Sequence, residues 1–407
     1  MGPIEIDYSD PGYWADPHSV LRGAREKHPL ARSSIGYWLV LRHADVERLL
    51  RSPALIVPGA EILAAQGITE GPLAEWWPLI LFNTNPPTHT RLRALLSRAF
   101  TPRRVETLRP RIRGIAHALL DRRSAAGTAD LVADFAHELP IIAMCELLGV
   151  PDGDHARFIE ASTELALSFS LDMPPDLRAR IERALLSLYA YTDELLERRR
   201  SQPGPDLLSA LIAAEEAGDR LSQRELRALT VNLLLAGHDT TRSLLSIGAW
   251  LLLSRPGVVG RLRERPDLVP DAVEEILRFE PVAEGVARKA IERIELGGVA
   301  LEPGELLFLS LLSANRDPAV FADPDRFDPE RADNRHLSFG RGLHFCLGAS
   351  LARAEAQEGF AVLLERLLDV ETCIATPRWQ PFTANRRIEA LPVRFRAHAP
   401  VGIERAS

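Results

Sequence analysis

The stretch Phe339-Gly340-Arg341-Gly342-Leu343-His344-Phe345-Cys346-Leu347-Gly348 decides the fold. Its glycines let the backbone pass close to a bulky planar group and let N–H groups point at the sulfur of Cys346. We expect a helix to begin just after Cys346, where its positive end would stabilise a thiolate and lower the pKa of the cysteine. A lone cysteine is more often a small buried hydrophobic residue. Cys145 lies in an apolar helix pattern, Cys373 has no context like that of Cys346, and both are interpreted as structural. The neighbourhood of Cys346 predicts a metal ligand instead.

This segment resembles the haem-binding loop of the cytochrome P-450 family, whose pattern is phenylalanine-glycine-x-glycine-x-histidine-x-cysteine-leucine-glycine. Three further motifs follow in the order and spacing of that family, and the resemblance covers roughly residues 15 to 396. It implies a mainly α fold with small β-sheets and a long central helix over the haem, which would be heme b (iron protoporphyrin IX). It also implies that Cys346 binds the iron and that Phe339, Gly340 and Gly348 contact the cofactor. A thiolate ligand favours O–O cleavage, so the implied activity is a monooxygenase.

The second motif, Ala236-Gly237-His238-Asp239-Thr240-Thr241, falls in the middle of a long predicted helix. Ser222 and Glu225 form a capping box at its start, and Pro256-Gly257 follows its end. We therefore expect a helix over about residues 222 to 254, long enough to cross the whole molecule.

Glycine inside a helix costs about 1 kcal/mol relative to alanine. A bond from Thr240 to the carbonyl of Ala236 would bend or open the helix there and leave room for dioxygen and water. By itself the motif is typical of an amphipathic helix with a solvated Asp239. In the family, however, the matching acid–alcohol pair delivers protons during oxygen activation. The resemblance thus implies that Asp239 and Thr240 are catalytic and that Ala236 and Gly237 border the haem.

The third motif is Glu275-Ile276-Leu277-Arg278, and Arg331 follows downstream in Phe327-Asp328-Pro329-Glu330-Arg331. Residues i and i+3 share a helix face, although most such pairs are weak surface contacts. In the family the residues matching Glu275, Arg278 and Arg331 form a buried triad that holds the cysteine loop. The resemblance gives these three a structural role.

The fourth motif runs from Asn85 to Arg93 and places His89 and Arg93 on one helix face. Such a cationic pair is usually solvated, but the resemblance implies that both residues contact a haem propionate. Arg288 and His344 match the other propionate partners, and charge-assisted bonds to carboxylates favour these residue types. Asn85 stands where the family often has Asp.

The chain is interpreted as a single domain over residues 1–407. We expect helix-rich parts at about 87–280 and 347–368, and β-rich parts at about 30–42, 286–311 and 380–396. In the last of these, a predicted hairpin, Arg387 stands where many family members have glycine. Further helices are predicted at 105–124, 128–149, 176–200 and from Pro270 to before Pro281, and an irregular loop at 313–345.

The substrate pocket is expected to be mostly apolar, as pockets for carbon skeletons are. Glu280 and Glu284 are close in sequence to expected pocket residues. They would either contact a cationic or hydroxylated substrate or, as is commoner for acidic residues, be solvated or paired. By resemblance the pocket draws on residues 60–84 and 164–175 and on Asn232, Leu235, Val282, Val286, Phe382 and Thr383.

Composition sets limits on partners. The 407 residues carry a formal net charge of -7, which argues against general nucleic-acid binding. No apolar run approaches the roughly 20 residues that span a bilayer, and no targeting signal is visible, so we expect a cytoplasmic, monomeric protein with a small-molecule substrate. Electrons from NAD(P)H would arrive through a ferredoxin and its reductase, since no nicotinamide or flavin fingerprint is present. A basic docking patch, or equally an ordinary solvated face, is formed by Arg91, Arg98, Arg103, Arg104 and Arg353.

Two other functions compete with the monooxygenase. One is a peroxide-driven or non-oxygenating haem-thiolate enzyme of the same fold, such as a dehydratase or isomerase. The other is a non-catalytic haem protein. The presence of Cys346, Asp239 and Thr240 favours the monooxygenase over both.

Overall fold

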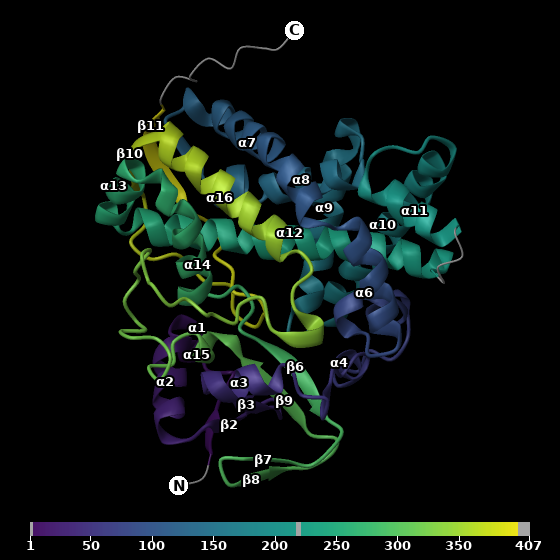
Figure 1. Cartoon of the computed structure of the whole chain (residues 1–407), viewed down its shortest axis with the longest axis vertical. Helices are drawn as coiled ribbons and strands as arrows, with labels where there is room; N and C mark the ends of the chain where they lie inside the picture. Colours follow the sequence, from purple (N-terminus) through teal and green to yellow (C-terminus); the bar gives the residue numbers. More distant parts are fainter. Residues whose placement is uncertain (1–2, 217–220, 398–407) are drawn as a thin grey trace.

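A long helix, α12 (Gln223–Leu253), crosses the molecule from side to side (Figure 1). The computed structural model describes residues 3–216 and 221–397. At the start of α12 the Ser222 side chain accepts a hydrogen bond from the backbone N–H of Glu225, and the Glu225 carboxylate accepts one from the N–H of Ser222. The predicted capping box and the predicted extent of the helix are confirmed.

Other helices surround α12 in the upper part of Figure 1. It packs against α8 (Glu138–Leu148), α10 (Pro175–Ser201), α14 (Val269–Phe279) and α16 (Ala349–Arg366). Apolar residues on almost every side of α12 are buried, which is why a helix this long is stable. The remaining helices are α1 (Pro11–Ala15), α2 (Pro17–Lys27), α3 (His43–Leu49), α4 (Glu61–Ala64), α5 (Pro72–Trp76), α6 (Thr88–Ala99), α7 (Pro102–Ser124), α9 (His155–Leu165), α11 (Leu207–Glu216), α13 (Pro256–Glu264) and α15 (Leu311–Ala314).

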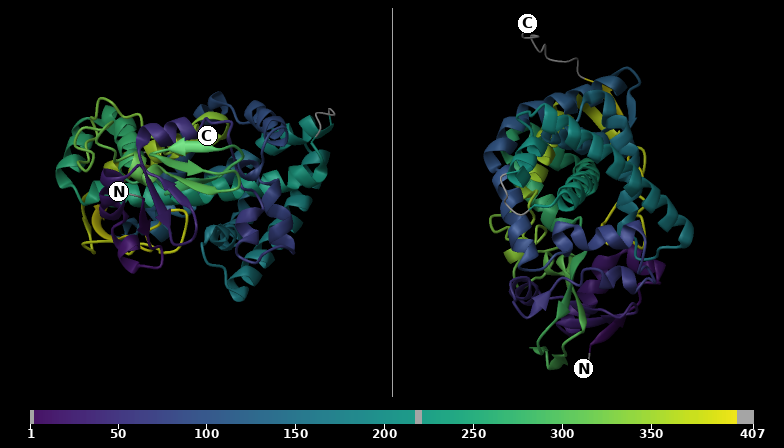
Figure 2. Two further views of the ribbon diagram at one scale, coloured as in Figure 1. Left: turned by 90° about the horizontal axis from the view of Figure 1, so that it is seen from below. Right: turned by 90° about the vertical axis from the view of Figure 1, so that its right-hand side faces the viewer.

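Most strands lie at the opposite end of the molecule from most helices, as Figure 1 and the right-hand view of Figure 2 show. A six-stranded mixed sheet has the order β1-β2-β3-β9-β6-β4, and β7 and β8 form a separate hairpin. The strands are β1 (Ile4–Ile6), β2 (Leu30–Ser33), β3 (Trp38–Val40), β4 (Leu55–Ile56), β6 (Gly285–Ala290), β7 (Ile294–Leu296), β8 (Val299–Leu301) and β9 (Leu306–Ser310).

The predicted fold class, mainly α with small β-sheets, is confirmed, but two local predictions are wrong. The predicted helix over 128–149 begins as strand β5 (Thr128–Asp130) followed by a π-helical turn, and only α8 is α-helical. The predicted 380–396 hairpin is a turn with an isolated bridge between Trp379 and Ile388. Its last residues form β11 (Pro392–Ala397), which pairs with β10 (Leu367–Thr372) and β5. These pairings join distant segments, so local periodicity does not reveal them.

No single helix in the described ranges is long and apolar enough to cross a membrane. The region predicted as an irregular loop, 313–345, is irregular apart from the end of α15 and one short 3₁₀ turn, η7 (Gly342–His344). This segment leads directly to Cys346.

Candidate functional site: a cavity between Cys346 and the central helix

The backbone around Cys346 depends on its glycines. Gly340 and Gly342 have φ values of +68° and +70°, a region that side chains rarely adopt. A Cβ atom on Gly342 would also lie 3.0 Å from the carbonyl oxygen of Leu50. The turn closes with a 2.9 Å hydrogen bond from the N–H of Cys346 to the carbonyl of Phe339, and α16 starts three residues after the cysteine.

Burial raises the pKa of the Cys346 thiol, although the N–H of Gly348 and the charges of Arg93 and Arg353 act in the opposite direction. The prediction that the helix start lowers the pKa of Cys346 is therefore wrong for the protein chain alone, because desolvation raises this pKa by more than the favourable groups lower it. A buried sulfur with a raised pKa becomes a thiolate readily only when a cation binds it. This environment fits a cysteine that serves as a metal ligand.

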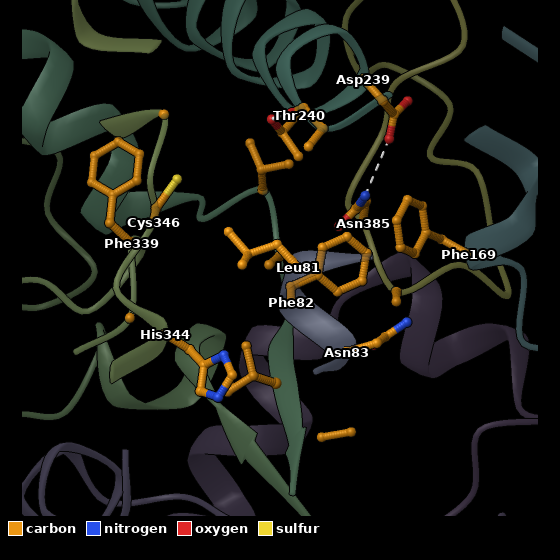
Figure 3. A pocket seen from close by; sticks show the side chains of 18 of the residues that line it. Leu81, Phe82, Asn83, Phe169, Asp239, Thr240, Phe339, His344, Cys346 and Asn385 are labelled. Carbon is orange, nitrogen blue, oxygen red and sulfur yellow. Dashed lines mark hydrogen bonds between the residues drawn. The ribbon is translucent and has the colours of Figure 1, made fainter. Parts of the chain in front are cut away.

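A cavity of about 480 Å³ lies between Cys346 and the middle of α12 (Figure 3). Its wall is mainly apolar, as predicted. Of the predicted pocket residues, Phe382 and Thr383 do not line it; their neighbours Ala384 and Asn385 do, and Phe382 is 42% exposed. The predicted residues that line the cavity are His89, Arg93, Asn232, Leu235, Ala236, Gly237, Asp239, Thr240, Val282, Val286, Arg288, Phe339, Gly340, His344, Cys346 and Gly348.

Four basic side chains meet on one wall of this cavity. The rings of His89 and His344 lie with their centroids 4.2 Å apart, and both Nδ1 atoms are buried without a hydrogen-bond partner. Burial, reinforced by Arg93 and Arg288, lowers the pKa of His89 to about 4 and of His344 to about 3. Burial also lowers the pKa of Arg288 to about 10. Among the described residues, no carboxylate forms an ion pair with Arg93 or Arg288.

The positive charges of these four residues are disfavoured by burial and by one another, so an anionic group of a bound ligand would stabilise them. A planar macrocycle with carboxylate arms satisfies both the cluster and the apolar wall. The residues therefore fit haem, with Cys346 at the iron and the four basic side chains at the propionates.

On α12, the Thr240 hydroxyl donates a 2.8 Å hydrogen bond to the carbonyl of Ala236, as predicted. The expected opening does not break the helix, which continues from Gln223 to Leu253. Asp239 is 1% exposed, so a solvated Asp239 is excluded. Its Oδ2 accepts hydrogen bonds from Asn385 and Arg387, residues that the sequence did not connect to it.

The structural triad is assembled outside the cavity. Glu275 and Arg278 are fully buried and joined by two hydrogen bonds of 2.7 and 2.8 Å. Arg331 Nε lies 3.3 Å from Oε2 of Glu275. Arg278 also donates to three carbonyls of the loop that leads to the cysteine, those of Asn315, Pro324 and Arg326.

Glu280 and Glu284 are both buried and paired rather than solvated. Glu280 forms ion pairs with His18 and Arg386 at 2.8 Å. Glu284, which lines the cavity, accepts a 3.2 Å hydrogen bond from Tyr13, and its burial raises its pKa to about 7.

Sequence reasoning missed part of the wall. Tyr8, Ile35 and Tyr37 reach the cavity from the N-terminal part of the chain, where no motif marked them. The predicted segments 60–84 and 164–175 do reach the cavity: Trp77 and Phe82 of the first contact Phe169 of the second, with ring centroids 5.9 Å from it, and all three line the cavity.

The predicted basic patch contains paired arginines. Arg91 pairs with Glu225, and Arg353 makes two 2.7 Å hydrogen bonds to Glu274. Arg98 and Arg103 lie exposed on the surface. The patch is therefore less positive than its arginine count suggests.

A half-buried cysteine that faces an acid–alcohol pair across an apolar cavity with a basic wall defines the haem-thiolate class. The comparisons agree: the family model described as Cytochrome P450 matches residues 73–386. The mycinamicin IV hydroxylase/epoxidase of Micromonospora griseorubida is 41% identical over 93% of both chains. The 6-deoxyerythronolide B hydroxylase of Saccharopolyspora erythraea is 37% identical over 94% of this chain and 96% of its own. The crystal structure of CalO2 matches with a TM-score of 0.91 at 30% identity, covering 98% of this chain and all of that one. The chain belongs to the cytochrome P450 family and is a haem-binding monooxygenase.

Proposed function

We propose that this protein hydroxylates or epoxidises a small, largely apolar organic molecule of secondary metabolism, using O₂ and two electrons from NAD(P)H. A ferredoxin and its reductase supply the electrons. The observation that carries the proposal is the position of Thr240, which lines the cavity that contains Cys346, with Asp239 beside it on α12. The names of the relatives, which include hydroxylases of macrolide-type compounds, support the substrate class.

Bound haem supplies the redox centre at which dioxygen is activated. Cys346 holds the iron, and His89, Arg93, Arg288 and His344 fix the propionates through charge-assisted hydrogen bonds. The apolar wall excludes bulk water and orients the substrate.

Proton supply is the task of α12. The Thr240 hydroxyl donates its proton to the carbonyl of Ala236, so its oxygen is an acceptor at the cavity surface and becomes a donor there when the hydroxyl turns from that carbonyl. The Asp239 carboxyl passes a proton toward Thr240 and recovers one from solvent, so neither residue is changed after a cycle.

The test uses a panel of macrolactones, from which the compound with the largest Soret shift is taken as substrate. Wild type and Thr240→Ala are assayed with a [2Fe–2S] ferredoxin, its reductase and NADPH, and separately with hydrogen peroxide alone. We expect the mutant to consume NADPH but to form several-fold less product per NADPH. Full coupling in Thr240→Ala contradicts the relay, and product formation only with peroxide favours the peroxide-driven alternative.

A further inference from the structure

The carboxylate of Asp239 is held at the cavity wall by two residues of the C-terminal turn, and one of them, Asn385, lines the cavity with it. Oδ2 accepts hydrogen bonds of 2.5 Å from Arg387 Nη2 and 3.1 Å from Asn385 Nδ2, and Oδ1 is buried with no partner. Figure 3 shows the carboxyl group turned toward Asn385, while Thr240 lies closer to the Cys346 side. In this arrangement the printed hydrogen bonds of Asp239 lead to the C-terminal turn, whereas that of Thr240 leads to the carbonyl of Ala236.

Arg387 joins three segments that are far apart in sequence. Its Nη2 atom, which binds Asp239, also donates a 3.1 Å hydrogen bond to the carbonyl of Ala166, at the start of the 3₁₀ turn η5 (Ala166–Phe169). The turn that carries Arg387 is fastened to the same segment by a 3.2 Å bond from the N–H of Ala384 to the carbonyl of Phe169. Phe169 and Ala384 line the cavity, so the contacts of this arginine reach the cavity wall.

The charge of Arg387 is needed where it lies. Asp239 is 1% exposed and Arg387 4%, and a buried carboxylate without a counter-charge is strongly disfavoured. Arg242 and His137 are within electrostatic range of Asp239, since Asp239 raises the pKa of both against a larger lowering by burial. The only ion pair of Asp239 among the described residues is nonetheless with Arg387.

We propose that Arg387 is a positioning residue for proton transfer, which holds the carboxyl group of Asp239 on the C-terminal turn between deliveries. In each delivery Asp239 takes up one proton from the solvent, turns from Arg387 toward Thr240, and gives that proton to the Thr240 oxygen as the hydroxyl releases its own proton into the cavity. Asp239 then returns to the arginine, and both residues are unchanged. The inference rests on the proposed acid–alcohol relay. The proposal adds to that relay a residue from another part of the chain, on a turn whose residues Ala384 and Asn385 line the cavity.

The test compares Arg387→Met, which keeps the length of the side chain but not its charge, with Arg387→Lys, which restores a cation. Arg378→Met is the matched control, because Arg378 lies in the same C-terminal segment, is 86% exposed and faces Glu389 at 3.5 Å. Each variant is assayed with ferredoxin, reductase and NADPH. The rate is normalised to the haem-loaded fraction in the carbon-monoxide difference spectrum, so that lower stability alone does not change it.

We expect Arg387→Met to turn over about tenfold more slowly, a part of the roughly 10²–10⁴-fold that acid–base catalysis contributes. The solvent isotope effect in D₂O should rise, because proton transfer becomes limiting. Arg387→Lys should recover most of the rate, and Arg378→Met should match wild type.

A wild-type rate and isotope effect in Arg387→Met overturn the inference, whatever the stability of the variant. Asp239→Asn separates this outcome from failure of the relay itself. If Asp239→Asn is slow while Arg387→Met is normal, only the role of Arg387 is lost. If Asp239→Asn turns over like wild type, the relay and the role of Arg387 both fail.

Discussion

Replacing Glu275 with glutamine removes one negative charge from the most enclosed ion pair of the described chain while keeping the size of the side chain. Glu275 accepts hydrogen bonds from Arg278, from the backbone N–H of Asp328, from Arg331 and from Asn334. Glutamine has one acceptor oxygen where glutamate has two. Its NH₂ group would face N–H groups that now donate to the carboxylate, and two donors cannot form a hydrogen bond with each other. The guanidinium of Arg278, which is fully buried, would lose its counter-charge.

The expected cost follows from this burial. Removing one partner of a buried pair typically destabilises a protein by about 3–5 kcal/mol. The matched control is Glu295→Gln, because Glu295 makes a 2.6 Å ion pair with Arg293 in which both side chains are 61% exposed. An exposed pair of this kind contributes about 0–1 kcal/mol. The two substitutions remove the same charge, so their difference measures the effect of burial.

The assay is unfolding in guanidinium chloride, followed by far-UV circular dichroism and by Soret absorbance. Glu275→Gln should lower the midpoint without changing the slope, and it should release haem before the helices unfold, because Arg278 ties the cysteine loop. If Glu275→Gln lies within 1 kcal/mol of Glu295→Gln and keeps its haem, the structural role given to the triad is refuted.

Three further predictions concern the cofactor, the packing and the pH dependence. Cys346→Ser should lose the strongly red-shifted Soret band of the reduced carbon-monoxide complex; its retention would show that another residue holds the iron. Gly248→Ala should destabilise the protein by about 1–3 kcal/mol, because the added Cβ would lie 2.3 Å from the ring of Phe360. Gly114→Ala is the control: a Cβ there has no atom within 4 Å, and the substitution should stabilise helix α7 by about 0.5–1 kcal/mol. Equal unfolding midpoints of the two variants in denaturant would contradict this prediction. Glu284 has its pKa raised to about 7 by burial. The folded state therefore holds this proton to higher pH than the unfolded chain does, and the protein should lose up to about 3 kcal/mol of stability as pH rises from about 4.5 to about 7. Glu284→Gln should remove that loss, and an unchanged pH dependence of unfolding in Glu284→Gln would contradict the assignment.

The sequence by itself determined the features that depend on neighbouring residues. The capping box at Ser222 places the start of α12, because both hydrogen bonds of the box close within one turn. The glycines before Cys346 fix the loop, because positive φ values at Gly340 and Gly342 are accessible to glycine at little cost. Together with the resemblance to a family, these local signals identified the cysteine, the acid–alcohol pair and the basic residues of the cavity.

Only the tertiary structure decided which distant groups meet. Residues 128–130 were predicted to be helical from their periodicity. They form a strand because they pair with β11, which lies more than 250 residues later in the chain. Arg387 stood out only as a departure from glycine, and its partner Asp239 lies 148 residues earlier. Tyr8 and Tyr37 complete the cavity wall from the other end of the chain. Strand pairing and buried ion pairs depend on which surfaces the folded chain brings together and removes from water. Local patterns in a single sequence do not predict these contacts between distant segments.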